Sequence, residues 1–444
     1  MDEREAQLRE NVLLAVQRYW AHCDAKTPYR IGDYIPYAGR IYDGEELCAL
    51  TEAALDFWLT AGPWTERFEG GLADYLGVPY CSMVNSGSSA NLLAFFTLTS
   101  PLLGERRILP GDEVITVASG FPTTVAPIVQ YGAVPVFVDI VLPTYNIDIS
   151  LLEGALSPRT RAVMVAHTLG NPFDLSAVTT FCKQHGLWLI EDNCDALGAR
   201  YQLDGKWYKT GTVGDIGTSS FYPAHHITTG EGGAVYTRDP LLHKILRSLR
   251  DWGRECVCPS GRDNTCGHRF SGQFGTLPAG YDHKYVYSHM GFNLKATDLQ
   301  AAIGTAQLQK LPSFVERRRQ NWQFLRETLT PLEDYFILPE ETEHAQASWF
   351  GFLITLRPEC PLSRDDVVAS LEAARIQTRP LFAGNLIRHP CFTALEEDRH
   401  YRMGSPLLVT DQVMERSFWV GVYPGLSQAM LEEIASQLRR AVGR

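Results

Sequence analysis

Short apolar runs alternate with helical segments over residues 80–240, and this alternation constrains the fold more than any other feature. The runs are DEVITVA (112–118), VPVFVDI (134–140), RAVMVAH (161–167), LWLIED (187–192) and GGAVYT (232–237), separated by stretches such as SLLEGALSP (150–158) and LSAVTTFCKQHG (175–186). This pattern predicts an α/β fold with a mainly parallel sheet and helices on both faces. Ligands of such sheets bind at the carboxyl ends of the strands, so we expect the functional residues there.

The flanking regions predict an N-terminal arm and a second domain. We expect a helical arm over residues 1–35, a large domain over 36–334 and a smaller C-terminal α/β domain over 335–444. A long helical pattern from 293 to 329 leads into the small domain, and we expect a break in it at Pro312.

Charge and hydropathy exclude two classes of partner. The net charge is −11 and no basic run is present, which argues against a nucleic-acid surface. No stretch of about 18 apolar residues could span a membrane, and the acidic, amphipathic start is unlike a signal peptide. We therefore expect a cytoplasmic protein with neither nucleic acid nor membrane as its partner.

Three segments contain residues suited to a phosphorylated pyridine cofactor. In MVNSGSSANLLAF (83–95), Gly87 and Ser88 precede a helical pattern, and N–H groups at a helix start can bind phosphate. A plain serine N-cap explains the same residues. Asp192 ends an apolar strand, where it could hold a protonated ring nitrogen or cap the next turn. Phe121, in ASGFPTT, could stack on the ring or be a core aromatic.

The order of seven segments resembles one enzyme family over about residues 35–440. They are SGSSAN, GFPTT, GAVPVFVDI, AHTLGNPFD, LIED, SFYPAHHITTGEGGAV and MGFNLKATDLQAA. This order is similar to the DegT/DnrJ/EryC1/StrS family of pyridoxal-phosphate (PLP) enzymes of fold type I, which act on nucleotide-linked keto sugars. In family aminotransferases the Schiff-base lysine stands five residues after the serine of SFxPxK, and the same count from Ser220 gives His225.

The missing lysine implies a different chemistry. The resemblance implies that pyridoxamine phosphate (PMP) binds noncovalently and that His225 acts as a general base, so that the enzyme dehydrates a sugar at C3. The alternatives are that His225 is a degenerate position in an inactive homologue, that His226 is the base, or that the two histidines bind a metal.

Ten cysteines are too sparse in a chain of this length for a disulfide scaffold. Four of them stand out by their arrangement in the sequence. The segment RDWGRECVCPSGRDNTCGHRF (250–270) resembles the 3-dehydrases of this family that carry a [2Fe–2S] cluster. Cys256, Cys258 and Cys266 match the spacing of that kind. The first ligand would be Cys194, which 61 residues separate from Cys256, four more than in that kind. We place the extra residues in a surface hairpin within ARYQLDGKWYKTG (199–211).

The position of Cys194 suggests where a cluster would lie. It follows Asp192 by two residues, about 6.5 Å of extended chain, so a cluster held by Cys194 would lie beside the cofactor. Four thiolates suit a [2Fe–2S] cluster and also structural zinc, and the thiols could also remain without a metal.

The resemblance implies roles for further residues. Ser88 and Ser220 would bind the cofactor phosphate, and Asn293 would reach the phosphate of a neighbouring subunit, which implies a homodimer. Asp195 stands where aminotransferases have a glutamine near the cofactor's 3-hydroxyl. Tyr222 and Phe350 would line the sugar pocket, or both could be core aromatics.

The predicted function is reductive removal of the C3 hydroxyl of a nucleotide-linked 4-keto-6-deoxyhexose, with PMP and a [2Fe–2S] cluster. Electrons would come from an NAD(P)H-dependent flavin/iron–sulfur reductase or from a ferredoxin or flavodoxin system. Two alternatives remain: a cluster-free sugar 3-dehydratase with structural zinc, and a noncatalytic cofactor-binding regulator.

Overall fold

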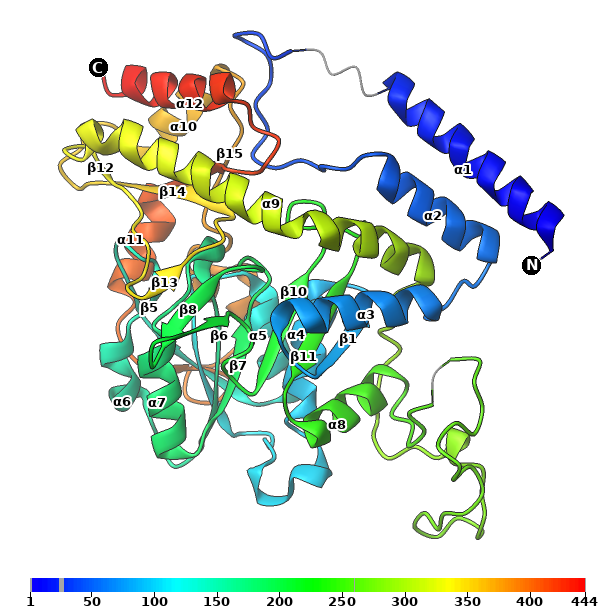
Figure 1. The fold of residues 1–444 in the computed structure, drawn as a ribbon. Helices are drawn as coiled ribbons and strands as arrows, with labels where there is room; N and C mark the ends of the chain where they lie inside the picture. Colours follow the sequence, from blue (N-terminus) through cyan, green and yellow to red (C-terminus); the bar gives the residue numbers. More distant parts are fainter. Residues whose placement is uncertain (1, 24–27, 259, 444) are drawn as a thin grey trace.

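An eight-stranded sheet forms the centre of the molecule (Figure 1). The computed structural model describes residues 2–23, 28–258 and 260–443. In spatial order the strands are β1 (Tyr80–Val84), β11 (Gly233–Thr237), β10 (Ile216–Ser220), β7 (Trp188–Asp192), β6 (Thr160–Ala166), β2 (Glu113–Val117), β3 (Val134–Val138) and β16 (Arg402–Met403). Only β11 runs antiparallel to its neighbours in this sheet. The predicted mainly parallel sheet is therefore confirmed.

Both faces of the sheet are buried, which explains why its strands have uninterrupted apolar sequences. In β6, Ala162 and Met164 pack in one core cluster while Val163 and Val165 pack in another. The first cluster includes residues of α4 (Gly87–Thr97), α5 (Pro122–Tyr131) and α8 (Pro240–Arg250), and the second includes residues of α7 (Leu175–His185). Helices thus cover both faces, as predicted.

The predicted hairpin between residues 199 and 211 is also confirmed. Strands β8 (Arg200–Leu203) and β9 (Lys206–Lys209) pair antiparallel around Asp204 and Gly205. Both turn residues have positive φ, 49° and 74°, as a two-residue turn of this hand requires. A short strand from later in the chain, β13 (Ala345–Gln346), pairs with β8.

A second, antiparallel sheet lies in the C-terminal part of the chain. Its order is β12 (Phe336–Ile337), β14 (Gly351–Leu356), β17 (Ser417–Gly421) and β15 (Thr378–Arg379). Its core includes residues of α10 (Arg364–Ala373) and α12 (Gln428–Ala441). From the same part of the chain, β16 joins the large sheet and α11 (Leu408–Arg416) precedes β17. The domain boundary at residues 334 and 335 stays a prediction.

The long helix α9 (Asp298–Leu329) runs continuously through Pro312, so the predicted break is wrong. Pro312 cannot donate a hydrogen bond to the carbonyl one turn earlier. The residues around it, Leu308, Leu311 and Phe314, are nevertheless buried in one core cluster, and this packing keeps the helix intact. Tertiary burial outweighs the local cost of the proline.

Three of the remaining α-helices lie at the N-terminal end. Further along the chain, β4 (Ile140–Val141) pairs with β5 (Asn146–Ile147). The predicted arm contains α1 (Glu3–Cys23), which has no buried residue and contacts α2 (Gly44–Asp56). Helix α3 (Pro63–Leu76) packs against α9, and α6 (Leu152–Ala155) is a single turn. None of the described helices is long and apolar enough to cross a membrane.

Candidate active site

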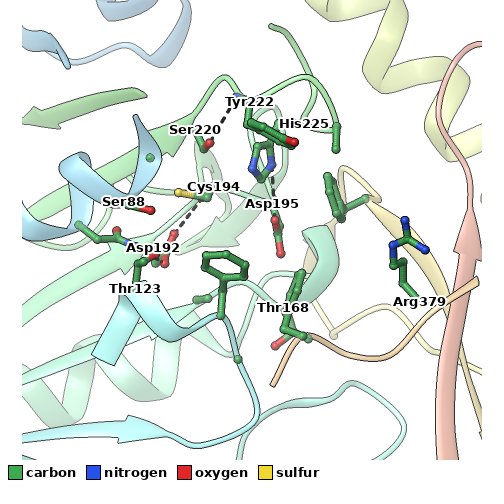
Figure 2. A pocket seen from close by; sticks show the side chains of 18 of the residues that line it. Ser88, Thr123, Thr168, Asp192, Cys194, Asp195, Ser220, Tyr222, His225 and Arg379 are labelled. Atoms are coloured by element: carbon green, nitrogen blue, oxygen red, sulfur yellow. Dashed lines mark hydrogen bonds and ion pairs between the residues drawn. The ribbon is translucent and has the colours of Figure 1, made fainter. Parts of the chain in front are cut away.

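A cavity of about 470 Å³ opens at the carboxyl ends of the central strands (Figure 2). Val117 of β2, Ala166 of β6, Asp192 of β7 and Ser220 of β10 all line it. The structure therefore has a cavity at the edge of the sheet where we expected the functional residues. Ten of the predicted site residues line it: Gly87, Ser88, Phe121, Asp192, Cys194, Asp195, Ser220, Tyr222, His225 and Phe350.

The start of α4 forms one end of the cavity. Ser86 is the N-cap, and its hydroxyl accepts a hydrogen bond of 3.0 Å from the Ser89 N–H, so the capping interpretation holds for Ser86. Both Ser86 and Ser88 line the cavity. A Cβ on Gly87 would overlap the side chain of Ser220, so only glycine allows this close approach of helix and strand. The unpaired N–H groups of the first helical turn can bind a phosphate here.

Asp192, at the end of β7, is held in one orientation by three donors. Its Oδ2 accepts hydrogen bonds of 2.7 Å from Asn91 Nδ2 and from Thr124 Oγ1. Its Oδ1 accepts one of 3.1 Å from the Cys194 N–H, so Asp192 caps the next turn and also lines the cavity. Sequence reasoning missed Asn91 and Thr124, although Asn91 belongs to the SGSSAN segment. Three donors orient the carboxylate toward a cationic ring N–H.

His225 and Asp195 lie next to each other in the wall of the cavity. Its Nδ1 lies 3.6 Å from Asp195 Oδ1, and the side chain of His225 is 15% exposed. Within the described residues this buried Nδ1 has no hydrogen-bond partner. Burial, together with the positive charge of Arg318, lowers the pKa of His225 to about 4. The imidazole is therefore neutral at pH 7 and can accept a proton.

The pKa of Asp195 is raised, in contrast to that of His225. Burial and the nearby charge of Asp192 raise the pKa of Asp195 well above its usual value. Arg318 Nη2 donates a 3.1 Å hydrogen bond to the carbonyl oxygen of His225, which fixes the backbone of this pair. Sequence reasoning missed Arg318, since a buried arginine within α9 carries no local signal of the loop carbonyls that it contacts.

His226 is directed away from the cavity. Its Nε2–H donates a 2.8 Å hydrogen bond to the carbonyl oxygen of Ser348, and its side chain is buried. Burial lowers the pKa of His226 well below its usual value. The two adjacent histidines thus occupy different environments, one lining the cavity and one within the core.

Aromatic side chains and an arginine complete the cavity. Phe121 is 50% exposed, and Phe382 contacts it edge-on with ring centroids 5.7 Å apart. Tyr222 and Phe350 also line the cavity, as does Arg379, which the sequence did not single out. Asn293 lies elsewhere, exposed on the surface, where its Oδ1 accepts a 2.9 Å hydrogen bond from Lys295 Nζ.

The four predicted cysteine ligands divide between two places. Cys194 lines the cavity, where burial and the charge of Asp192 raise its pKa well above the usual value. The other three lie in what we call the cysteine segment, residues 251–258 and 260–297. The ligand atoms of Cys256, Cys258 and His283 lie within 4.8 Å of one another. Among the described residues, Cys194 belongs to no such group.

Cys266 lies next to this group, with its Sγ 3.6 Å from His283 Nε2. Burial alone would raise the pKa of the Cys258 thiol, but hydrogen bonds from Thr265 and Cys266 outweigh it and bring the pKa to about 7. The arrangement can hold a thiolate-binding metal. Sequence reasoning missed His283, whose spacing from the cysteines matches no pattern that it considered.

Comparison with known proteins places this site in a family. The model of the DegT/DnrJ/EryC1/StrS aminotransferase family matches residues 41–439. The chain belongs to this family. It is 50% identical over 437 residues to the lipopolysaccharide biosynthesis protein RfbH of Salmonella typhimurium, covering 98% of both chains. It is 48% identical to the dTDP-4-dehydro-2,6-dideoxy-D-glucose 3-dehydratase of Saccharopolyspora spinosa, covering 98% of this chain and 92% of that one.

Solved structures of family members share the fold. The E. coli GDP-4-keto-6-deoxy-D-mannose 3-dehydratase with bound hydrated PLP superimposes with a TM-score of 0.79. The two are 27% identical, and the match covers 92% of this chain and 99% of that one. Both the predicted family and the predicted PLP fold type I are therefore confirmed, and relatives of this chain include sugar 3-dehydratases that bind PLP.

Proposed function

We propose that this protein removes the C3 hydroxyl of a nucleotide-linked 4-keto-6-deoxyhexose reductively, using PMP and a [2Fe–2S] cluster. The observation that carries the proposal is His225, a neutral imidazole with an unpartnered Nδ1 in the cavity, at the position where family aminotransferases have a lysine. An imidazole can move a proton but cannot form the covalent link that a lysine amine forms. The similarity to a 3-dehydratase supports the same reaction class.

The cavity fits the cofactor at three points. The first turn of α4, with Ser88 and Ser220, is suited to the phosphate. The Asp192 carboxylate, held by Asn91 and Thr124, is suited to the protonated ring nitrogen. The half-exposed face of Phe121 is suited to stacking on the ring. When bound, PMP supplies an electron sink that permits loss of the hydroxyl adjacent to the ketone.

His225 takes the proton from the cofactor carbon that bears the amine. Its lowered pKa keeps the imidazole unprotonated and ready to accept. Asp195, whose raised pKa favours the protonated carboxyl, lies 3.6 Å from His225 Nδ1, close to it but without a hydrogen bond. Tyr222, half exposed in the same wall, is placed to contact the sugar.

Arg379 is suited to the diphosphate of a nucleotide sugar. It lines the cavity, and no ion pair among the described residues involves it. Its guanidinium contacts the ring of Tyr37 at 4.3 Å, which positions the charge without neutralising it. Its Nη1 also donates a 2.9 Å hydrogen bond to the Thr378 carbonyl oxygen, but among the described residues no carboxylate neutralises it, so the charge suits an anionic substrate group.

The reaction needs electrons that the cavity residues do not provide. Replacing a hydroxyl by hydrogen consumes two electrons and two protons and releases one water. A [2Fe–2S] cluster bound by Cys256, Cys258 and Cys266 with a fourth ligand would supply single electrons, and the sequence predicts Cys194 as that ligand. The donor would be a flavin/iron–sulfur reductase, or a ferredoxin or flavodoxin system. We also propose a homodimer in which Asn293 reaches the cofactor phosphate of the second copy.

An anaerobic assay tests the proposal. Purified protein loaded with PMP, iron and sulfide is mixed with CDP- or dTDP-linked 4-keto-6-deoxyhexose and a chemical reductant, and products are identified by mass spectrometry. We expect a 3-deoxy sugar only when the reductant is present. Turnover with glutamate alone, in protein containing zinc but no sulfide, would instead identify a cluster-free dehydratase. No turnover of either substrate would point to a noncatalytic cofactor-binding protein.

A further inference from the structure

We propose that three cationic side chains of the β8–β9 hairpin and of α9 bind the phosphate group of a small ligand. They are Arg200 in β8, Lys209 in β9 and Arg319 in α9, and we call them the cation cluster. None of these three described residues lines the cavity of the candidate active site. The site is therefore separate from the cofactor and sugar positions, and the proposal does not depend on the proposed function.

The register of the small three-stranded sheet brings two like charges together. In the order β13, β8, β9, the residues Gln346, Arg200 and Lys209 are direct neighbours, and Figure 1 shows β13 beside β8. Residues directly opposite each other on antiparallel strands have Cβ atoms about 5 Å apart, and like charges in such a pair destabilise it. The backbone thus holds Arg200 against Lys209 at a cost that a bound anion would remove.

Hydrogen bonds anchor both arginines of the cation cluster beside β13. Arg200 Nε donates a 2.6 Å hydrogen bond to Gln346 Oε1. Arg319 Nε donates one of 2.7 Å to the Ala347 carbonyl oxygen, and its Nη2 donates one of 3.1 Å to the Gln346 carbonyl oxygen. Since a guanidinium group has five N–H donors, each arginine keeps donors for a ligand.

Lys209 completes the cation cluster above an aromatic ring. Its Nζ lies 3.6 Å from the ring centroid of Tyr75. Burial, together with the positive charges of Arg200 and Arg319, lowers the pKa of Lys209 to about 8. A phosphate group bound here would raise this pKa again, because an opposite charge favours the charged form of the amine.

The cation cluster has no internal counter-ion. Among the described residues, no ion pair involves any of its three members. The charges of Glu341 and Glu316 act on Arg319, but from beyond ion-pair distance. Two guanidinium groups and an ammonium group without a carboxylate form the donor set that phosphate prefers in proteins.

The first test measures protection of Lys209. Full-length protein is saturated with PLP, so that the cofactor phosphate position is filled, and is acetylated with trace acetic anhydride at pH 8. Modification of each lysine is measured by mass spectrometry in inorganic phosphate and in chloride of the same ionic strength. Phosphate should slow acetylation of Lys209 about tenfold, because the bound anion keeps the amine protonated. Lys206, an exposed lysine of the same hairpin, should react equally in both.

The second test compares variants of the PLP-loaded protein. Lys209→Gln and Arg200→Gln should each weaken binding of inorganic phosphate at least about tenfold in isothermal titration. Lys206→Gln is the matched control and should bind like the wild type. Lys209→Glu should raise the melting temperature without phosphate, because the new carboxylate pairs with Arg200. It should also lose the stabilisation that phosphate gives the wild type.

A nucleotide and free phosphate present the same group, and cytidine monophosphate distinguishes them. Trp207 is 42% exposed and lies two residues before Lys209, on the same face of the hairpin, where it is placed to stack on a base. Tighter binding of cytidine monophosphate than of phosphate, lost in Trp207→Leu, would identify a nucleotide, and equal affinities would identify free phosphate.

Three outcomes overturn the proposal, and none of them involves sugar turnover. They are the absence of phosphate binding by the PLP-loaded wild type, an unchanged phosphate affinity in both Lys209→Gln and Arg200→Gln, and equal effects of phosphate on Lys209 and Lys206. The proposed function is unaffected by any of these results, since the cation cluster lies outside the cavity.

Discussion

The cavity and the cysteine segment are stabilised by different interactions. The strands of the large sheet that contribute to the cavity, β2, β6, β7 and β10, are almost entirely buried, and the register of parallel pairs positions their side chains. The cysteine segment has one short helix, η4 (His283–Tyr285), and is held by local hydrogen bonds and exposed ion pairs such as Arg269 with Asp263. Exposed ion pairs contribute little stability each. The comparison teaches that the cavity rests on a buried sheet, whereas the segment has little buried core; under the proposed function, a bound metal would stabilise the segment.

The largest expected effect concerns the base in the preformed cavity. His225→Lys should lower dehydration about 10²- to 10⁴-fold, because a protonated amine replaces a neutral imidazole. Product formation is measured under single turnover with bound PMP. The matched control is His226→Gln, which changes the buried neighbour and should reduce thermal stability while keeping the rate per folded molecule. Full activity in His225→Lys would show that another group is the base.

Metal removal should affect the two regions unequally. Treatment with a chelator and reductant is expected to raise proteolytic cleavage within the cysteine segment on the order of 100-fold, because metal binding supplies its folding free energy. The affinity for PLP should stay within about twofold, since the cavity is formed by buried strands. Cleavage sites are mapped by mass spectrometry and affinity by absorbance. Equal loss of both properties would contradict the proposed difference.

A smaller effect tests how tightly the cavity is built. Gly87→Ala would place a methyl group against Ser220, and the resulting overlap should weaken PLP binding about tenfold. Gly154→Ala is the matched control, because the space around Gly154 in α6 is open. Isothermal titration of both variants measures the difference. Unchanged affinity in Gly87→Ala would mean that α4 can shift relative to β10.

The smallest effect is the pH dependence. Because the pKa of His225 is lowered to about 4, its base form persists well below the usual histidine range. The kcat/KM should therefore stay nearly constant from pH 7 to pH 5 and fall only as the pH drops toward 4. A histidine with the reference pKa of about 6.5 would lose roughly 30-fold by pH 5. A decline centred near 6.5 would show that His225 is solvated during the reaction.

The sequence was sufficient to predict the cavity because the ends of parallel strands meet at one edge. Asp192 ends LWLIED, one of the runs of the strand pattern, whereas Ser220 and His225 were assigned through the resemblance to the family. Arg379 and Phe382 could not be found in this way, since they come from the second sheet and the loop after it. Their approach depends on how the two sheets pack, which no local pattern records.

Two other errors of sequence reasoning have physical reasons. Pro312 does not break α9, because burial of its neighbours outweighs one lost hydrogen bond. His283 was missed because its nearness to the cysteines arises from the pairing of Arg254 with Tyr287, 33 residues apart in sequence. Spacing rules describe ligands within short motifs and carry no information on such a pairing.

Strand β16 limits how substrate enters. It extends the large sheet beside β3, and β17, only fourteen residues after Met403, lies in the smaller sheet. A hinge that swung the two sheets apart would have to peel β16 from β3, or stretch the chain that connects it to β17. Under the proposed function, a nucleotide sugar would therefore reach the cavity through the loops around it and not by a hinge that separates the two sheets.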